Sequence, residues 1–186
     1  TGRTRYYDDV YVSSMLFDND GNLWVGTDFN GVYRINPKTG EINRFPRLLQ
    51  LEPGLIRTIF QESPGLMWFG SDYGGAFRFD TASGKISQFI YDHRQPGSLN
   101  SKTILSIYRD RGGIFWFGTY DGIGKWNPRT AAFGNFIHQP NNPGSLSHHS
   151  VQAILEDDRG RIWIGTYSGL DRFDPVTGTY KHYRTK

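Results

Sequence analysis

The chain contains no cysteine among its 186 residues. Disulfide bonds, thiolate zinc sites and cysteine nucleophiles are therefore excluded, although this absence assigns the chain to no compartment. Long apolar runs are missing as well: no stretch approaches the roughly 18 uninterrupted apolar residues of a membrane span, and no signal peptide is recognisable. Because residue 1 is Thr rather than Met, we expect a processed or excised segment of a longer protein.

The chain also lacks a large excess of charge of one sign. Lys and Arg number 21 against 18 Asp and Glu, a formal net charge of +3, and the basic residues are scattered rather than clustered. This pattern does not favour nucleic acid as a partner. No apolar helical stripe of three or four turns is present, whereas glycine (23 residues) and aromatics (16%) are abundant. The composition predicts a soluble, all-β domain with little or no helix.

One pattern occurs four times: an acid, two residues, Gly, two residues, Trp, one residue, Gly, and then Thr or Ser. The copies begin at Asp18, Glu62, Asp110 and Asp157. Their tryptophans are 44, 48 and 47 residues apart, a spacing typical of one propeller blade per repeat. The repeated structural residues are Trp24, Trp68, Trp116 and Trp163, each followed two positions later by Gly26, Gly70, Gly118 or Gly165.

Each repeat is read as four short strands, which in the first copy are 12–17 (inner), 23–27, 32–35 and 41–45 (outer). In the turn after the inner strand, the acid is expected to accept backbone N–H bonds while Gly takes a positive φ. The Trp is expected to pack between neighbouring blades, and the next Gly to permit close backbone approach. The following Thr or Ser is expected to bond across strands. The sequence therefore predicts a β-propeller segment of four consecutive, four-stranded antiparallel blades.

Residues 1–186 are expected to form a single propeller segment. Residues 1–7 are assigned to the outer strand of a preceding blade, because Thr1, Gly2 and Tyr7 repeat the spacing of later outer strands. The four blades are assigned to 8–45, 46–89, 90–136 and 137–186. Because the last blade already has its outer strand, we expect an open part of a larger propeller, with a closed four-bladed ring as the alternative. Uncovered blade faces predict self-association of the isolated chain, for example two arcs closing one eight-bladed ring.

Catalytic and metal sites are not predicted. The four repeated acids lie on four different blades, too far apart for a catalytic carboxylate pair about 5–9.5 Å apart. His148 and His149 are adjacent, so on an extended chain they should point to opposite sides. His93, His138 and His182 lack the spacing of metal ligands. No phosphate-binding loop, nucleophile elbow or kinase motif is present, so we expect no enzyme activity and no cofactor in this segment.

A binding surface is predicted from loop lengths. From each Trp to the aromatic that closes its repeat the distance is 20 or 21 residues, but from that aromatic to the next Trp it varies from 17 to 27. Connections that vary on a constant scaffold are typical of binding sites. The same face should carry the turns between second and third strands, where aromatics stand beside acids, as sugars require. The candidate ligand residues are Asp28, Phe29, Asp72, Tyr73, Tyr120, Asp121 and Tyr167. The alternative is that they only cap strands and form turns.

The repeat, D-x-x-G-x-[LI]-W-[VI]-G-T continuing to G-[VL]-x-R-[IF]-[ND]-P-x-T-G, resembles the two-component regulator propeller repeat. That repeat is found in extracytoplasmic sensor regions of hybrid histidine kinases of Bacteroidetes. Residues 96–99 and 143–146, both Pro-Gly-Ser-Leu, resemble the linkers before inner strands in those proteins. The resemblance covers nearly the whole chain. The departures are Glu62 for Asp, Ser71 for Thr, Thr81 for Pro, Ala131 for Gly, and a second repeat without the Ser-Leu linker.

The resemblance implies part of a seven-bladed periplasmic sensor that binds an oligosaccharide or another small ligand. It also implies partners in the parent protein, namely the remaining blades and a histidine kinase or other output domain. Two other functions stay open. The chain could be a protein-interaction platform, or it could resemble the virginiamycin-type lyases, which need a catalytic His with an acid and a metal that no loop here supplies convincingly.

Overall fold

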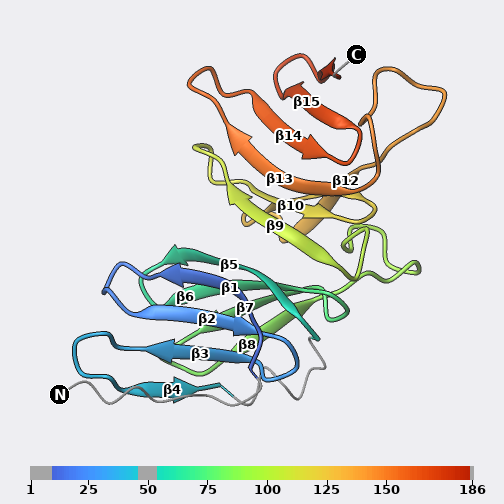
Figure 1. Cartoon of the computed structure of the whole chain (residues 1–186). Helices are drawn as coiled ribbons and strands as arrows, with labels where there is room; N and C mark the ends of the chain where they lie inside the picture. Colours follow the sequence, from blue (N-terminus) through green and yellow to red (C-terminus); the bar gives the residue numbers. More distant parts are fainter. Residues whose placement is uncertain (1–9, 46–53, 185–186) are drawn as a thin grey trace.

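The computed structural model describes residues 10–45 and 54–184, and these residues contain sixteen β-strands and no helix. The strands form four antiparallel sheets of four strands each, and neighbours within every sheet follow one another along the chain (Figure 1). The predicted all-β architecture of four blades is therefore confirmed. The predicted outer strand at residues 1–7 lies outside the described residues. Within the described ranges no helix is long and apolar enough to cross a membrane.

The strands have the following bounds. Blade one contains β1 (Val12–Phe17), β2 (Leu23–Thr27), β3 (Val32–Ile35) and β4 (Ile42–Arg44). Blade two contains β5 (Ile56–Ser63), β6 (Leu66–Ser71), β7 (Ala76–Asp80) and β8 (Ile86–Phe89). Blade three contains β9 (Ile104–Arg109), β10 (Phe115–Thr119), β11 (Gly122–Asn127) and β12 (Ala132–Phe136). Blade four contains β13 (Val151–Glu156), β14 (Ile162–Thr166), β15 (Gly169–Asp174) and β16 (Thr179–Tyr183). The first outer strand is shorter than predicted, since β4 begins at Ile42 and ends at Arg44.

The four blades are arranged as an open arc. The inner strands β1, β5, β9 and β13 contact one another in sequence, and blades one and four stand at opposite ends of the molecule (Figure 1). Each junction is a layer of apolar side chains from two facing sheets. This stacking resembles that of repeat proteins, in which each unit buries its apolar face only against its neighbours.

The repeated acid and the repeated Trp form one hydrogen-bonded unit. In all four blades the indole Nε1–H donates to the carboxylate six residues earlier, at 2.8 or 2.9 Å. In blade one the carboxylate of Asp18 also accepts the backbone N–H groups of Asp20 and Asn22, and Gly21 has a φ of 81°. The predicted turn chemistry is therefore present, and the indole bond is an additional role of the acid that the sequence pattern did not predict.

The environment of the tryptophans differs at the end of the arc. Trp24, Trp68 and Trp116 are at most 1% exposed, and each packs against an aromatic ring of the next blade 5.4 to 6.1 Å away. Trp163 is only half-buried and stacks on Tyr183 of its own blade at 5.3 Å. The difference follows from position, because among the described residues no blade covers the outer side of blade four.

The glycine two residues after each Trp meets the next blade. A Cβ added at Gly26, Gly70 or Gly118 would lie 2.6 to 2.9 Å from a side-chain carbon of the next inner strand, closer than real contacts allow. At Gly165 the nearest atom would be 3.6 Å away, an ordinary contact. The first three glycines therefore set how closely consecutive blades approach.

Candidate functional site

All seven candidate ligand residues lie on one side of the arc, which we call the loop face. It is formed by the turns between the second and third strand of each blade together with the connections between blades. Four aromatic side chains project from these turns, with exposed fractions of 76% for Phe29, 70% for Tyr73, 38% for Tyr120 and 70% for Tyr167. The loop face thus presents one solvent-exposed aromatic ring per blade, in the turn between the second and third strands.

Arg57 forms an ion pair within blade two on this face. Its Nε and Nη2 atoms donate to the two carboxylate oxygens of Asp72 at 2.5 and 3.1 Å, a bidentate ion pair. The Arg57 side chain is 36% exposed, so the pair stands at the surface rather than in the core. The hydrogen bond that Arg57 donates to Asp72 raises the pKa of Arg57, and the negative charge of Asp72 adds to this effect. Of the candidate ligand residues, Asp72 is therefore paired with a guanidinium group.

The position of Arg57 explains why the sequence pattern missed it. The pairing of β5 with β6 shifts register between Ile56 and Thr58, so Arg57 occupies a β-bulge at the loop-face end of its inner strand. A bulge re-aims a side chain and is often found beside binding sites. The equivalent register shifts in blades one and four contain Ser13 and Gln152, which carry no charge. No spacing rule marks Arg57, and only its departure from the other repeats could have indicated it.

Phe29 has an unusual backbone conformation. Its φ is 58°, although bulky residues avoid the left-handed region, which costs about 1–2 kcal/mol per residue. Burial of the side chain does not compensate for this cost, because Phe29 is 76% exposed. Backbone strain at an exposed residue, where it does not serve core packing, is typical of binding surfaces, which makes Phe29 a candidate ligand contact.

Blade four offers a different set of groups. The ring of His148 lies 6.0 Å from that of Tyr167 in an edge-on arrangement and 4.0 Å from the ring of His149, on which it stacks. The expectation that His148 and His149 point to opposite sides is therefore wrong, because the chain bends here instead of forming a strand. Burial lowers the pKa of His148, and the neighbouring His149 and His138 lower it further. Tyr167 is thus grouped with imidazoles rather than with the Arg57 pair.

Asp121 takes part in the site through its backbone. Its carbonyl oxygen accepts the Asn100 Nδ2–H at 2.8 Å, and Asn100 also donates to the Thr119 hydroxyl at 3.2 Å. The Asp121 residue itself is exposed. Tyr73 lies against Gly54, where an added Cβ would be 3.0 Å from the ring. These contacts fix the turns while leaving the rings and the Asp121 side chain at the surface.

The loop face offers flat aromatic rings for stacking, carboxylate oxygens as acceptors and the Arg57 guanidinium group as a donor. In the parts of the chain that the structure describes, no group of three or more His, Asp or Glu side chains is placed to hold a metal ion.

A family model described as two component regulator propeller matches residues 6–29, 98–121 and 145–168. Three of the four repeats are two component regulator propeller repeats. The second repeat lies outside these matches and is the one with Glu62 and Ser71 in place of Asp and Thr. A search of curated protein sequences finds no match.

Solved structures similar to this chain share its fold. The extracellular domain of a hybrid two component system from B. thetaiotaomicron superposes with a TM-score of 0.79 at 19% identity, over 93% of this chain and 24% of that one. PorZ, a surface component of the type-IX secretion system of Porphyromonas gingivalis, gives 0.69 at 17% identity over 92% and 27%. An inactive variant of virginiamycin B lyase from Staphylococcus aureus gives 0.70 at 16% identity over 95% and 56%. The chain therefore spans about a quarter of the first two proteins and just over half of the lyase.

Proposed function

We propose that this segment is the ligand-sensing part of a two-component regulatory system and that its loop face binds an oligosaccharide. The observation that carries the proposal is the exposed aromatic ring in the turn between the second and third strands of every blade, at Phe29, Tyr73, Tyr120 and Tyr167. A ligand made of repeated units fits a surface whose contact groups repeat along an arc.

The chemistry of these groups favours sugars. The C–H faces of a sugar ring stack on Tyr and Phe, while its hydroxyls donate to carboxylates and accept from guanidinium N–H groups. The pair of Arg57 and Asp72 supplies both kinds of partner in one plane, and each carboxylate oxygen keeps a lone pair for a ligand hydroxyl. The described turns between second and third strands carry Asp28, Asp72 and Asp121 and no basic residue, so a neutral sugar is a better match than a polyanionic one.

The proposed signalling route follows from the position of the site. A ligand that contacts turns of several blades would restrict their relative motion, and a histidine kinase or another output domain of the parent protein would read this change. In this proposal the segment lies on the periplasmic side of the membrane.

The proposal is tested by thermal shift with a panel of neutral and acidic oligosaccharides, with and without a divalent metal. For a sugar that raises the melting temperature, Tyr120→Ala and Tyr167→Ala should each weaken binding by about tenfold, since losing an aromatic contact costs about 0.5–1.5 kcal/mol beyond the lost area. The matched control is Val176→Ala, because Val176 is 93% exposed in the turn between β15 and β16 at the opposite ends of the strands. Unchanged affinity in both tyrosine variants would remove them from the site. A shift that requires the metal would favour a lyase-like activity, and the absence of a shift with every sugar would count against the proposal.

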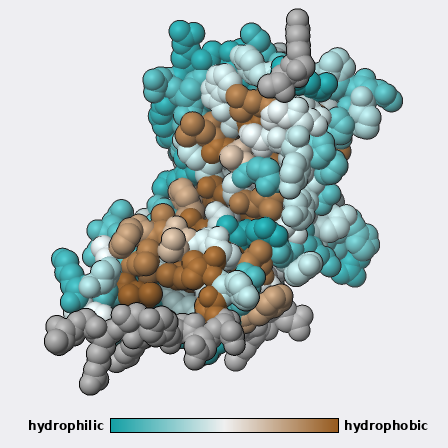
Figure 2. All heavy atoms as spheres, viewed as in Figure 1, coloured by the Kyte–Doolittle hydropathy of each residue, from teal (hydrophilic) through white to brown (hydrophobic). Residues whose placement is uncertain are grey.

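We also propose that the isolated chain self-associates through its two end blades. Blade one exposes a cavity of about 160 Å³ that is almost entirely apolar, and Figure 2 shows brown, apolar residues gathered over this blade. It is lined by Val10, Val12, Met15, Val25, Thr27, Tyr33, Ile35 and Ile42. Within the molecule, blades two to four use the same side to receive the Trp of the preceding blade, so the half-buried Trp163 of a second copy is the natural occupant.

Light scattering at high micromolar concentration tests this association. Met15 is 65% exposed on the blade-one surface, so Met15→Glu should yield a monomer, whereas Val176→Glu should not alter the assembly. A monomeric unsubstituted chain would refute the association.

A further inference from the structure

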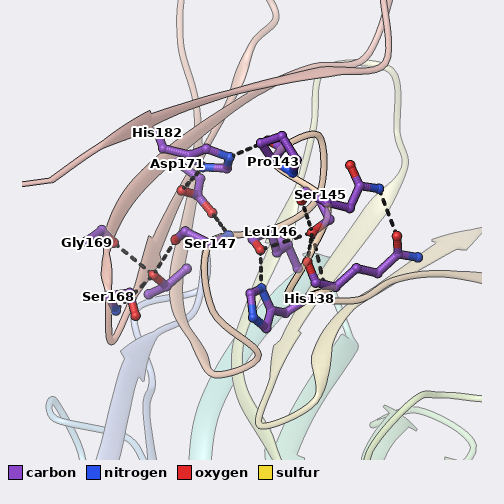
Figure 3. Close-up of polar contacts among 12 residues, drawn as sticks. His138, Pro143, Ser145, Leu146, Ser147, Ser168, Gly169, Asp171 and His182 are labelled. Atoms are coloured by element: carbon purple, nitrogen blue, oxygen red, sulfur yellow. Dashed lines mark hydrogen bonds and ion pairs between the residues drawn. The ribbon is translucent and has the colours of Figure 1, made fainter.

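One histidine outside the candidate ligand residues ties the connection between blades three and four to the outer strand of blade four (Figure 3). We call this connection, residues 137–150, the blade-four linker. His182 on β16 places Nδ1 2.7 Å from an oxygen of Asp171 and Nε2 2.8 Å from the carbonyl oxygen of Pro143. The first contact lies within blade four and the second reaches the linker.

The two partners fix the protonation state of His182. A carboxylate and a carbonyl oxygen are both acceptors, and a neutral imidazole has only one N–H to donate. Both contacts are therefore hydrogen bonds only when His182 is the doubly protonated imidazolium ion. Asp171 is fully buried, and a buried carboxylate requires a compensating charge and hydrogen-bond donors. The imidazolium supplies the charge, and the backbone N–H of Ser147 donates to the second carboxylate oxygen at 2.8 Å.

The same network reaches the loop face. The hydroxyl of Ser147 lies 3.1 Å from that of Thr166, and the Thr166 hydroxyl donates to the carbonyl of Gly169 at 3.1 Å and accepts the N–H of Ser168 at 3.2 Å. Residues 166–169 form the turn that presents Tyr167. His182 and the Tyr167 turn are thus joined through Asp171 and Ser147.

We propose that His182 is a pH-responsive latch that, when protonated, holds the blade-four linker and the Tyr167 turn in place. Loss of its Nε2 proton turns the contact with Pro143 into two facing lone pairs, which releases the linker. The ordering of the linker is a property of this chain alone. Only the further consequence, weaker ligand binding at Tyr167 above the titration, rests on the proposed function.

The groups around His182 set the direction of the effect. Burial by itself lowers the pKa of His182, but the hydrogen bond to Asp171 and the contact with Pro143 outweigh it, so the pKa is raised, against the opposing charge of Arg184. The ring of Tyr180 on β16 stacks 6.2 Å away, and burial raises its pKa so that it stays neutral. On the linker side, Nδ1 of His138 lies 2.6 Å from the carbonyl of Leu146. Because the folded-state pKa of His182 is raised, its stabilisation is complete below about 6.5 and is lost as pH rises through the folded-state value.

Blade three contains a natural control. The connection between blades two and three, residues 90–103, is the blade-three linker and has the same Pro-Gly-Ser-Leu sequence. In blade three Asn135 occupies the strand position of His182, and Gly124 occupies that of Asp171. Asn135 donates its Nδ2–H to the carbonyl of Ser98 at 3.1 Å. The blade-three linker is therefore held by a side chain that does not titrate.

The latch is tested by hydrogen exchange of the two linkers between pH 5.5 and 8.5, corrected for intrinsic exchange rates, and by ¹⁵N NMR of the imidazoles. Residues 137–150 should lose protection by about tenfold as His182 deprotonates, a factor that corresponds to one hydrogen bond of about 1.4 kcal/mol, while the blade-three linker should not change. In His182→Asn, and in the double variant Asp171→Gly with His182→Asn that reproduces blade three, the pH response should disappear. A singly protonated His182 at pH 5.5, or equal responses of the two linkers, would overturn the proposal. A sugar affinity that ignores pH while the linker responds would instead count against the proposed ligand site.

Discussion

The Trp at each blade junction makes a quantitative prediction about how the arc is held together. Trp68 is 0% exposed and contacts Phe115, Phe117 and Trp126 of blade three. Burying a Trp removes about 150–250 Å² from water, worth about 4–6 kcal/mol at about 25 cal/mol per Å². Measured truncations of buried Trp to Ala cost about 3–5 kcal/mol. For a chain of this length each kcal/mol lowers the melting temperature by about 2–4 °C, so Trp68→Ala should lower it by about 6–20 °C.

Trp163→Ala is the matched comparison. Trp163 also donates its indole N–H to a carboxylate, at 2.9 Å against 2.8 Å for Trp68, so both variants lose the same kind of hydrogen bond. Trp163 is only partly buried and its aromatic partner lies in its own blade, so less apolar area is lost and a smaller shift than for Trp68→Ala is expected.

Far-UV circular dichroism is the suitable assay, because fluorescence changes when a Trp is removed. The measurement should be made at a concentration where light scattering shows a monomer, since association would cover Trp163. Equal shifts in the two variants would refute the conclusion that packing between blades stabilises the arc.

Three further predictions concern single positions. Burial alone would raise the pKa of Glu62, but its hydrogen bonds and its ion pair with Arg78 lower the pKa below 4.5. The stabilisation that Glu62 provides is therefore present above pH 4.5 and is lost as pH falls through the folded-state pKa. Glu62→Gln should flatten the dependence of the melting temperature on pH in this range. Gly118→Ala should cost about 1–3 kcal/mol, because the added Cβ would lie 2.9 Å from Val151, whereas Gly165→Ala should change stability by less than about 0.5 kcal/mol, and equal melting temperatures would contradict this. Ala131 has a φ of 53° where the other repeats have Gly, so Ala131→Gly should raise the free energy of unfolding by about 1 kcal/mol in urea titrations. An unchanged free energy of unfolding would contradict this prediction.

The sequence predicted the blades because their determinants are periodic. A Trp every 44 to 48 residues and an acid six residues before it specify the strand order and the turns, and these features are local. The sequence could not predict the pair of Arg57 and Asp72, because this contact depends on a bulge that the alternation of apolar residues does not reveal. The prediction for His148 and His149 is wrong because it assumes an extended chain where the backbone bends.

The departures from repeat symmetry are where function is concentrated in this fold. All four blades keep the hydrogen bond from indole to carboxylate, which positions the Trp side chain in each blade. On the loop face the equivalent positions diverge: a charged Arg57 stands where blade one has Ser13, and a half-buried His182 stands where blade three has Asn135. Each charge required a partner, Asp72 or Asp171, that the equivalent uncharged side chains do not need. Because a buried or half-buried ion pair contributes little net stability compared with a well-packed apolar pair, stability alone does not account for these two substitutions within the repeat. Recognition at Arg57 and pH response at His182 are the roles we propose for them, and an uncharged residue could not fill either role.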